Sequence, residues 1–247
     1  MRKFQSALML FAAVGVAAAQ APEPPLSDTR LTVHTLVRED VFAGLIGNEM
    51  ERFARGERNI ESLLELRPSE RANLIAWRGL TALYRAVVAH EAGKADEFAQ
   101  HFQRAQDDFA EAAKASSGND GVAAITGGTL VFLADRLPEK HRPAAWAQTY
   151  DAYSILWKQQ GAGIDKMPPH FRGEVLAGMA QSAQRTGRTE EAAQFVDKML
   201  VVMQGTPYEA TAKQWKADPA SASTTNLACK NCHNPGRLNA RLAALDK

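Results

Sequence analysis

The chain has 247 residues, of which 45% are hydrophobic and 23% charged. Its 29 basic and 28 acidic residues give a net charge of +1, so composition gives no support for binding to nucleic acid or to an anionic membrane surface. This length and apolar content are enough to bury one core, and with only two cysteines a framework of disulfides is excluded.

The N-terminal segment has the pattern of a secretory signal peptide over residues 1–19. Arg2 and Lys3 form a basic start, residues 7–18 are uncharged and apolar, and small residues precede Gln20. The apolar run is shorter than the roughly 20 residues of a membrane-spanning helix. No cysteine lies near the cleavage site, so we expect no lipoprotein anchor. We therefore expect an exported, periplasmic protein that is soluble after cleavage and has no membrane anchor.

Helical periodicity begins after an extended lead predicted over residues 20–35. The first apolar stripe recurs at three- and four-residue steps, and residues 59–66 are expected to form a separate short helix or turn before Pro68. The stripe consists of Val37, Val41, Leu45, Ile46, Met50 and Phe53. Further helices are expected over residues 73–92, 94–115 and 122–136, and from Pro143 to about residue 160.

Two parts of this region resemble tetratricopeptide repeats. Trp77, Leu80 and Tyr84 have the spacing of the first helix of that repeat, although Gly93 follows Tyr84 later than the repeat requires. A second match places a turn at Gly187 between two helices. Its small and apolar positions are Leu176, Met179, Ala180, Ala183 and Ala192. The resemblance implies an all-α fold over residues 36–217, with antiparallel helix pairs stacked as a tetratricopeptide-like solenoid.

The C-terminal part of the chain changes character twice. A capping box at residues 206–209 predicts one more helix. Residues 218–226 are small and polar, as in a linker. Residues 227–247 then contain both cysteines, and residues 237–245 fit a short amphipathic helix through Leu238, Leu242 and Leu245.

The sequence Cys229-Lys230-Asn231-Cys232-His233 is the attachment motif of c-type haem. At this point the chain resembles a monohaem c-type cytochrome. The resemblance implies one covalent haem c, bound through Cys229 and Cys232, with His233 as the proximal iron ligand. Other interpretations are a redox disulfide, a zinc site lacking its fourth ligand, or a chance pair of cysteines.

The second axial ligand is not fixed by the motif. The fourteen residues after His233 contain neither Met nor His, so the ligand has to come from upstream or the sixth iron position is open. This C-terminal placement is similar to that in cytochromes c-prime. Upstream candidates are Met199, Met203, Met167 and His170, although methionines on a helical stripe are usually core residues. Arg237 is a candidate for pairing with a haem propionate.

Three functions are consistent with these features. The first is an electron-transfer cytochrome whose helical repeats bind a redox partner protein. The second is a non-redox scaffold whose cysteine pair forms a disulfide or a metal clip. The third is a haem sensor or enzyme with an open sixth iron position. We find no catalytic constellation in the sequence, so an electron carrier is the preferred hypothesis over an enzyme.

Overall fold

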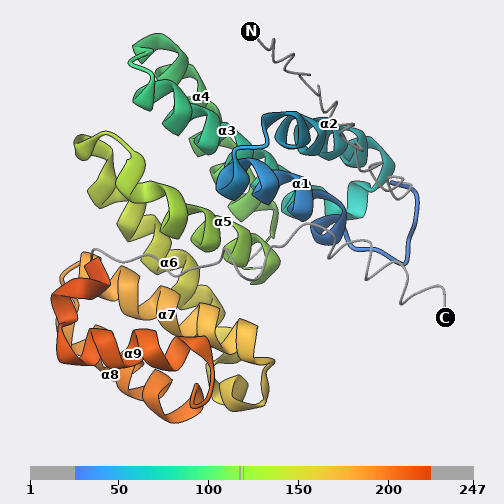
Figure 1. Ribbon diagram of the computed structural model, residues 1–247. Helices are drawn as coiled ribbons and strands as arrows, with labels where there is room; N and C mark the ends of the chain where they lie inside the picture. Colours follow the sequence, from blue (N-terminus) through green and yellow to red (C-terminus); the bar gives the residue numbers. More distant parts are fainter. Residues whose placement is uncertain (1–25, 117, 119, 224–247) are drawn as a thin grey trace, which may run out of the picture.

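The computed structural model describes residues 26–116, 118 and 120–223 (Figure 1). All regular structure in this part of the chain is helical, which confirms the predicted all-α class. The α-helices described are α1 (Val33–Gly47), α2 (Met50–Leu66), α3 (Arg71–Glu91), α4 (Ala95–Ser116), α5 (Asp120–Leu133), α6 (Arg142–Gln160), α7 (Pro169–Arg185), α8 (Thr189–Val202) and α9 (Pro207–Ala217). Short 3-10 helices are η1 (Pro68–Glu70), η2 (Ala134–Arg136), η3 (Glu139–His141), η4 (Gly161–Lys166) and η5 (Pro219–Ser223).

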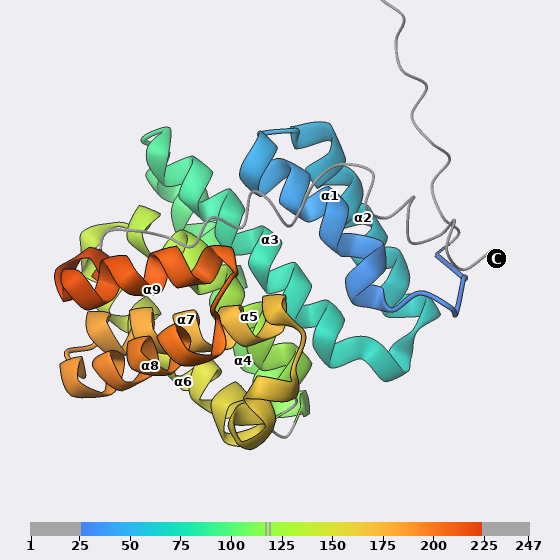
Figure 2. The same ribbon diagram turned by 60° about the horizontal axis from the view of Figure 1, so that its bottom comes forward.

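The helices pack as successive pairs. α1 lies along α2, α3 along α4, α5 along α6 and α7 along α8, and α9 packs on α8 (Figures 1 and 2). The short connections make the paired helices antiparallel. The odd-numbered helices also contact one another in order, α1 with α3, α3 with α5 and α5 with α7. Both sets of contacts are those of a helical repeat array.

α3 and α4 are the longest of the described helices, and they pack along each other. Gly93 has a φ of 71°, a left-handed conformation that glycine adopts without strain, and it turns the chain between the two helices. Trp77, Leu80 and Tyr84 are all buried on α3. Gly79 allows α4 to approach closely, because a Cβ there would lie 2.9 Å from the ring of Phe109. The predicted helices over 73–92 and 94–115 are therefore confirmed.

The α7–α8 pair has the small residues that its sequence suggested. Ala180, Ala183 and Ala192 are buried where the two helices meet. Gly187, with a φ of 77°, provides the left-handed residue in the turn between them. On the opposite side of α7, the buried ring of Tyr153 lies directly against the backbone at Gly178. Glycine at this position thus brings α6 and α7 into close contact.

The N-terminal region departs from two expectations. The first apolar stripe, over residues 37–53, belongs to two helices, because Asn48 adopts a left-handed conformation with a φ of 57° and ends α1. The predicted separate helix over 59–66 is wrong, since α2 continues unbroken through it. The helical domain also begins before residue 36. Thr32 Oγ1 accepts a hydrogen bond of 3.2 Å from the Thr35 amide, which caps α1 at Val33 and shortens the extended lead.

The C-terminal end of the described chain is packed against the helices. Residues 219–223 form η5, which contacts α7 and α9, and Ser221 and Ala222 are buried. The first part of the predicted linker therefore belongs to the helical domain. The rest of that linker, residues 224–226, the haem segment 227–247 and the signal peptide lie outside the described residues.

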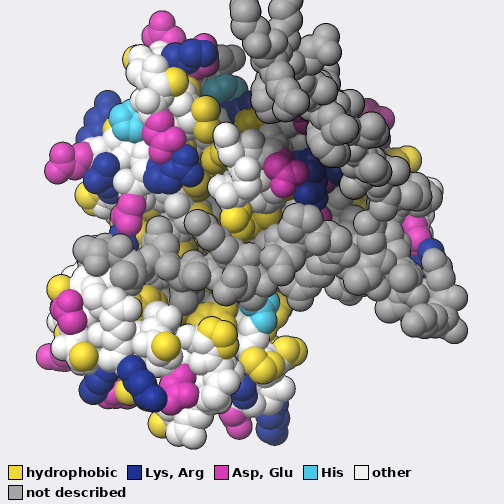
Figure 3. All heavy atoms as spheres, viewed as in Figure 1, with side chains coloured by type: hydrophobic (Ala, Val, Ile, Leu, Met, Phe, Trp, Pro, Cys, Tyr) yellow, Lys and Arg dark blue, Asp and Glu magenta, His cyan; other side chains and the backbone are white. Residues whose placement is uncertain are grey.

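The surface of this domain carries charges of both signs. Figure 3 shows Lys and Arg side chains interspersed with Asp and Glu on the visible face. Within the described ranges, no helix combines the length and hydropathy that a membrane span requires.

Candidate functional site

The residues predicted to hold haem lie beyond the described chain. Cys229, Cys232, His233 and Arg237 all fall in residues 224–247. The last described residue, Ser223, precedes Cys229 by six positions. Because an extended chain spans at most about 3.3–3.6 Å per residue, Cys229 lies within about 20 Å of Ser223. The candidate site is therefore the part of the domain around the end of η5.

The predicted distal ligands occupy two kinds of environment. Met199 on α8 and Met203, the residue that caps its C-terminal end, are fully buried in the hydrophobic core. Met167 is partly buried and packs against the same core. The side chain of His170 is 38% exposed. His170 is therefore the most accessible of the four candidates, while the two α8 methionines are core residues.

The antiparallel pairing of α7 and α8 brings these candidates to one end of the pair. Pro168 and Pro169 end the preceding turn and begin α7, which places Met167 and His170 at the helix start. Met199 and Met203 lie at the end of α8, alongside that start. The fold thus groups residues that are 29 to 36 positions apart in the sequence, although only His170 presents much of its side chain at the surface.

Glu174 accompanies His170 on α7. Its Oε2 lies 3.6 Å from His170 Nε2, one helical turn away. Its carboxylate also approaches α5, since a Cβ at Gly128 would lie 3.5 Å from Glu174 Oε1. Burial raises the pKa of Glu174 from its ordinary value to about 7. Near neutral pH this carboxyl group is consequently present in both protonation states.

The end of the described chain is held on the same helix. Gln181 Nε2 donates a hydrogen bond of 3.4 Å to the carbonyl oxygen of Ala222 in η5. Positions 170, 174, 177 and 181 recur at steps of three and four residues, so they share one face of α7. We did not identify Glu174 or Gln181 from the sequence, although this spacing from His170 was a usable signal.

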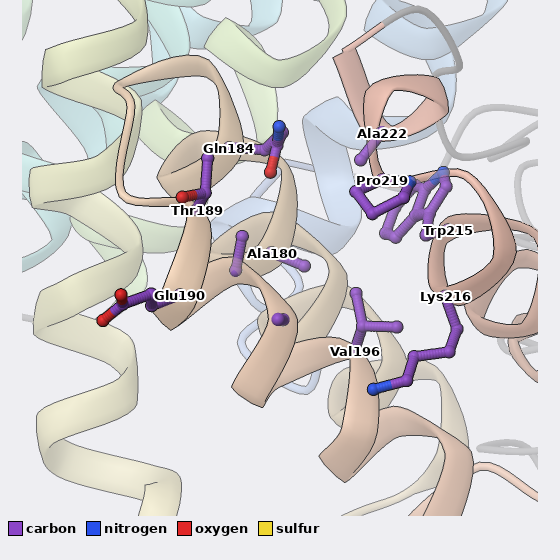
Figure 4. Close-up of a pocket in the computed structure, with 11 residues that line it drawn as sticks. Ala180, Gln184, Thr189, Glu190, Val196, Trp215, Lys216, Pro219 and Ala222 are labelled. Carbon is purple, nitrogen blue, oxygen red and sulfur yellow. The ribbon is translucent and has the colours of Figure 1, made fainter.

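An apolar groove lies at the end of the helix array, between α7, α8, α9 and η5 (Figure 4). Its volume is about 320 Å³, at the lower end of the range of about 300–1,000 Å³ for small-molecule sites. Trp215, Pro219 and Ala222 line one side, facing Ala180 and Val196 across the groove (Figure 4). The groove suits a small apolar group, and it is too small to enclose a whole porphyrin.

The groove has cationic and anionic groups at its edge. Lys216 lines it and forms an ion pair of 2.6 Å with Asp197 Oδ1 of α8. Glu190 lies on the α8 side of the groove. Among the residues that the structure describes, no three His, Cys, Asp or Glu side chains come together as metal ligands. Ligation by the described domain would thus involve single residues such as His170.

Comparisons with known proteins add no assignment. No protein-family model, curated protein or solved structure matches this chain.

Proposed function

We propose that this protein is an exported c-type cytochrome that carries one covalent haem and transfers single electrons to a partner protein. The observation that carries the proposal is the motif Cys229-Lys230-Asn231-Cys232-His233. Two thiols at this spacing suit thioether bonds to one porphyrin, and the adjacent histidine suits axial ligation. A simple disulfide leaves the histidine at this position unexplained, and a zinc site would need a fourth ligand beyond Cys229, Cys232 and His233.

The roles of the chain follow from this assignment. The haem supplies the one-electron couple. Cys229 and Cys232 fix its position, His233 holds the proximal side of the iron, and Arg237 pairs with a propionate. The helical domain supplies the surface on which a redox partner docks, because stacked helix pairs provide an extended binding face.

The N-terminal sequence supports export. In c-type cytochromes haem is attached outside the cytoplasm, and residues 1–19 have the charge and apolar pattern of a cleavable secretory signal. We therefore place the mature protein in the periplasm. Fractionation of cells expressing the full chain should recover the shorter, cleaved form with the periplasmic proteins.

Covalent haem attachment is the decisive test. The full chain should be expressed in a bacterium with a c-type haem maturation system and its intact mass measured after signal cleavage. We expect a mass increase of one haem, a Soret band, and sharp visible bands on reduction. The matched control is the double substitution Cys229→Ala and Cys232→Ala, which removes both attachment points. A wild-type protein without covalent haem would eliminate the proposal, and loss of two hydrogens would indicate a disulfide-linked scaffold instead.

The burial of Met199 and Met203 favours a second candidate function. Since both residues are fully buried in the core, neither is available to the iron without disrupting packing. An open sixth position, as in a gas sensor or haem enzyme, is therefore a specific alternative to electron transfer. Spectra of the ferrous protein with and without carbon monoxide distinguish them. A spectrum that carbon monoxide leaves unchanged supports an electron carrier with two axial ligands.

A further inference from the structure

The odd-numbered helices share a face rich in aromatic side chains. On α1, His34, Arg38 and Phe42 recur every four residues and therefore lie on one side of the helix. The His34 ring lies 5.1 Å from the Trp77 ring of α3, and the Phe42 ring 6.3 Å from it. Phe42 also meets the Phe132 ring of α5 at 6.1 Å, edge to face. These contacts connect three successive odd helices.

The α5 helix has an unusual composition for a surface helix. Asp120 is its only charged residue, and a helix that is apolar on all sides is normally buried on all sides. Ala124, Gly128 and Phe132 nevertheless remain partly exposed, at four-residue spacing along one face. Gly128 lies next to Glu174 of α7, which joins this stripe to the fourth odd helix.

We call these residues together the inner face. They are His34, Arg38, Phe42, Trp77, Ala124, Gly128, Phe132, His170, Glu174 and Gln181. The last described residues, in η5, contact this face on α7, because Gln181 donates a hydrogen bond to the carbonyl oxygen of Ala222. Two residues after Ala222, the segment 224–247 begins, which contains the haem motif.

A buried polar group beneath the face has no hydrogen-bond partner within the described part of the chain. Trp77 is 1% exposed, and its Nε1 has no hydrogen-bond acceptor among the described residues. Buried indole donors normally find an acceptor, so an unpaired one indicates a group that the described domain does not supply. An aromatic face above an unpaired N–H donor suits an apolar segment that carries hydrogen-bond acceptors.

We propose that the inner face is the docking site of this chain's own residues 224–247. The segment is long enough to extend from Ser223 across the inner face. Helix axes in contact lie about 8–10 Å apart, so α5 and α3 are about 10 and 20 Å from α7, and α1 about 30 Å. Six residues beyond Ser223 span up to about 20 Å, and the whole segment about 80 Å. The segment can therefore cross all four helices, with Cys229 and Cys232 opposite α5 or α3.

The porphyrin then lies over the Phe132 and Trp77 region, an assignment that rests on the proposed function. A segment of this length cannot enclose a haem alone, and an uncovered porphyrin would leave a large apolar patch in water. Attachment in the same chain favours this occupant over a separate protein, because a short tether gives effective concentrations of about millimolar order. The groove at the end of the array is too small for this role.

Photo-crosslinking tests the occupant without reference to haem. Benzoylphenylalanine should replace Phe132 in the full chain and, as the control, Val201, whose side chain on α8 is 69% exposed. After irradiation of the purified protein, we expect Phe132 but not Val201 to crosslink within the same chain to a peptide of residues 224–247. Crosslinks to a second copy, seen as a dimer mass, or no crosslink from position 132, would overturn the docking.

A pair of tryptophan substitutions then locates the porphyrin. Gly128→Trp fills the inner face, whereas Ala193→Trp fills the end groove, and each position is partly or fully exposed. We expect Gly128→Trp to lose most of the Soret circular dichroism while the covalent haem mass is unchanged, and Ala193→Trp to retain it. Gly128→Ala controls for folding. The reverse pattern overturns the porphyrin position, whereas absence of haem mass in the wild-type protein contradicts only the proposed function.

Discussion

His170 Nε2 and Glu174 Oε2 lie 3.6 Å apart across one turn of α7. Burial of the carboxyl group raises the pKa of Glu174 to about 7, above the ordinary value of 4.5. Glu174 therefore retains its proton in the folded protein at pH values where the unfolded chain has lost it. This difference links proton binding to the stability of the domain.

Stability should consequently decrease as the pH rises from 4.5 to 7. In this window the folded state binds more protons than the unfolded state, so the free energy of unfolding falls with pH, and the contribution of Glu174 is fully present below 4.5. Each pKa unit corresponds to about 1.4 kcal/mol, and with the side chain 30% exposed we expect a net effect of roughly 1–2 kcal/mol.

Urea unfolding at a series of pH values measures this effect. The difference between the wild-type protein and Glu174→Gln isolates it from other titrating groups, because the amide keeps the shape of the side chain and does not ionise. The stability of the variant relative to wild type should rise between pH 4.5 and 7. Parallel curves for the two proteins would show that the pKa of Glu174 is not raised.

Asp108 of α4 is a buried carboxylate shared by two arginines. Its side chain is 3% exposed and accepts hydrogen bonds from Arg78 at 2.8 and 3.1 Å and from Arg104 at 3.0 Å. Asp108→Asn removes the nearer and more buried of the two carboxylates beside the partly buried Arg78 guanidinium, leaving Glu61 at 3.9 Å, and we expect a loss of about 3 kcal/mol in the free energy of unfolding. Chemical denaturation measures it.

Arg104→Ala is the matched control. The Arg104 side chain is 53% exposed, so its ion pair with Asp108 is screened by solvent and should contribute under about 1 kcal/mol. If both substitutions had equal effects, the bidentate contact between Arg78 and Asp108 would not be the main source of stability between α3 and α4.

Much of the fold could be predicted because local signals and tertiary packing agree. Gly93 and Gly187 mark left-handed turns, and Pro143 and Pro169 lie at helix starts. The stripe over residues 37–53 did not locate the boundary between α1 and α2, because its apolar periodicity continues past Asn48, where α1 ends. The Gly47-Asn48 pair was the available signal there.

The candidate site was less accessible to sequence reasoning. The inner face proposed to receive the haem segment combines Phe42, Trp77 and Phe132 from three helix pairs, and only the packing of odd helices brings them together. Single helices show each of these residues as an ordinary apolar position. The haem motif, by contrast, is contiguous in sequence, and its local chemistry can be recognised without the fold.

Two glycines should respond oppositely to alanine. At Gly178 an added Cβ would collide with the ring of Tyr153, which is buried and has little room to move, so we expect Gly178→Ala to cost about 1–3 kcal/mol. At Gly128 the nearest atom among the described residues is Glu174 Oε1, 3.5 Å from the added Cβ, which is an ordinary contact. Gly128→Ala should therefore stabilise the domain by about 0.5–1 kcal/mol through helix propensity. Thermal unfolding of both variants compares them directly.

A double substitution identifies the cause of the Gly178 effect. Tyr153→Leu removes the ring that meets position 178, so Gly178→Ala should cost less in that background than in the wild type. Equal costs in the two backgrounds would locate the strain elsewhere on α7.

Replacing the buried methionines should leave the haem spectrum unchanged. Met199 and Met203 are 0% exposed, and leucine has nearly the same volume, so Met199→Leu and Met203→Leu should each cost under about 1.5 kcal/mol. If neither sulfur reaches the iron, the oxidised and reduced absorption spectra of both variants should match those of the wild type. His170→Ala is the informative comparison, because the His170 side chain is 38% exposed. It lies at the start of α7, the helix that holds η5 through Gln181. A spectral change in Met203→Leu alone would show that the end of α8 opens to supply the ligand.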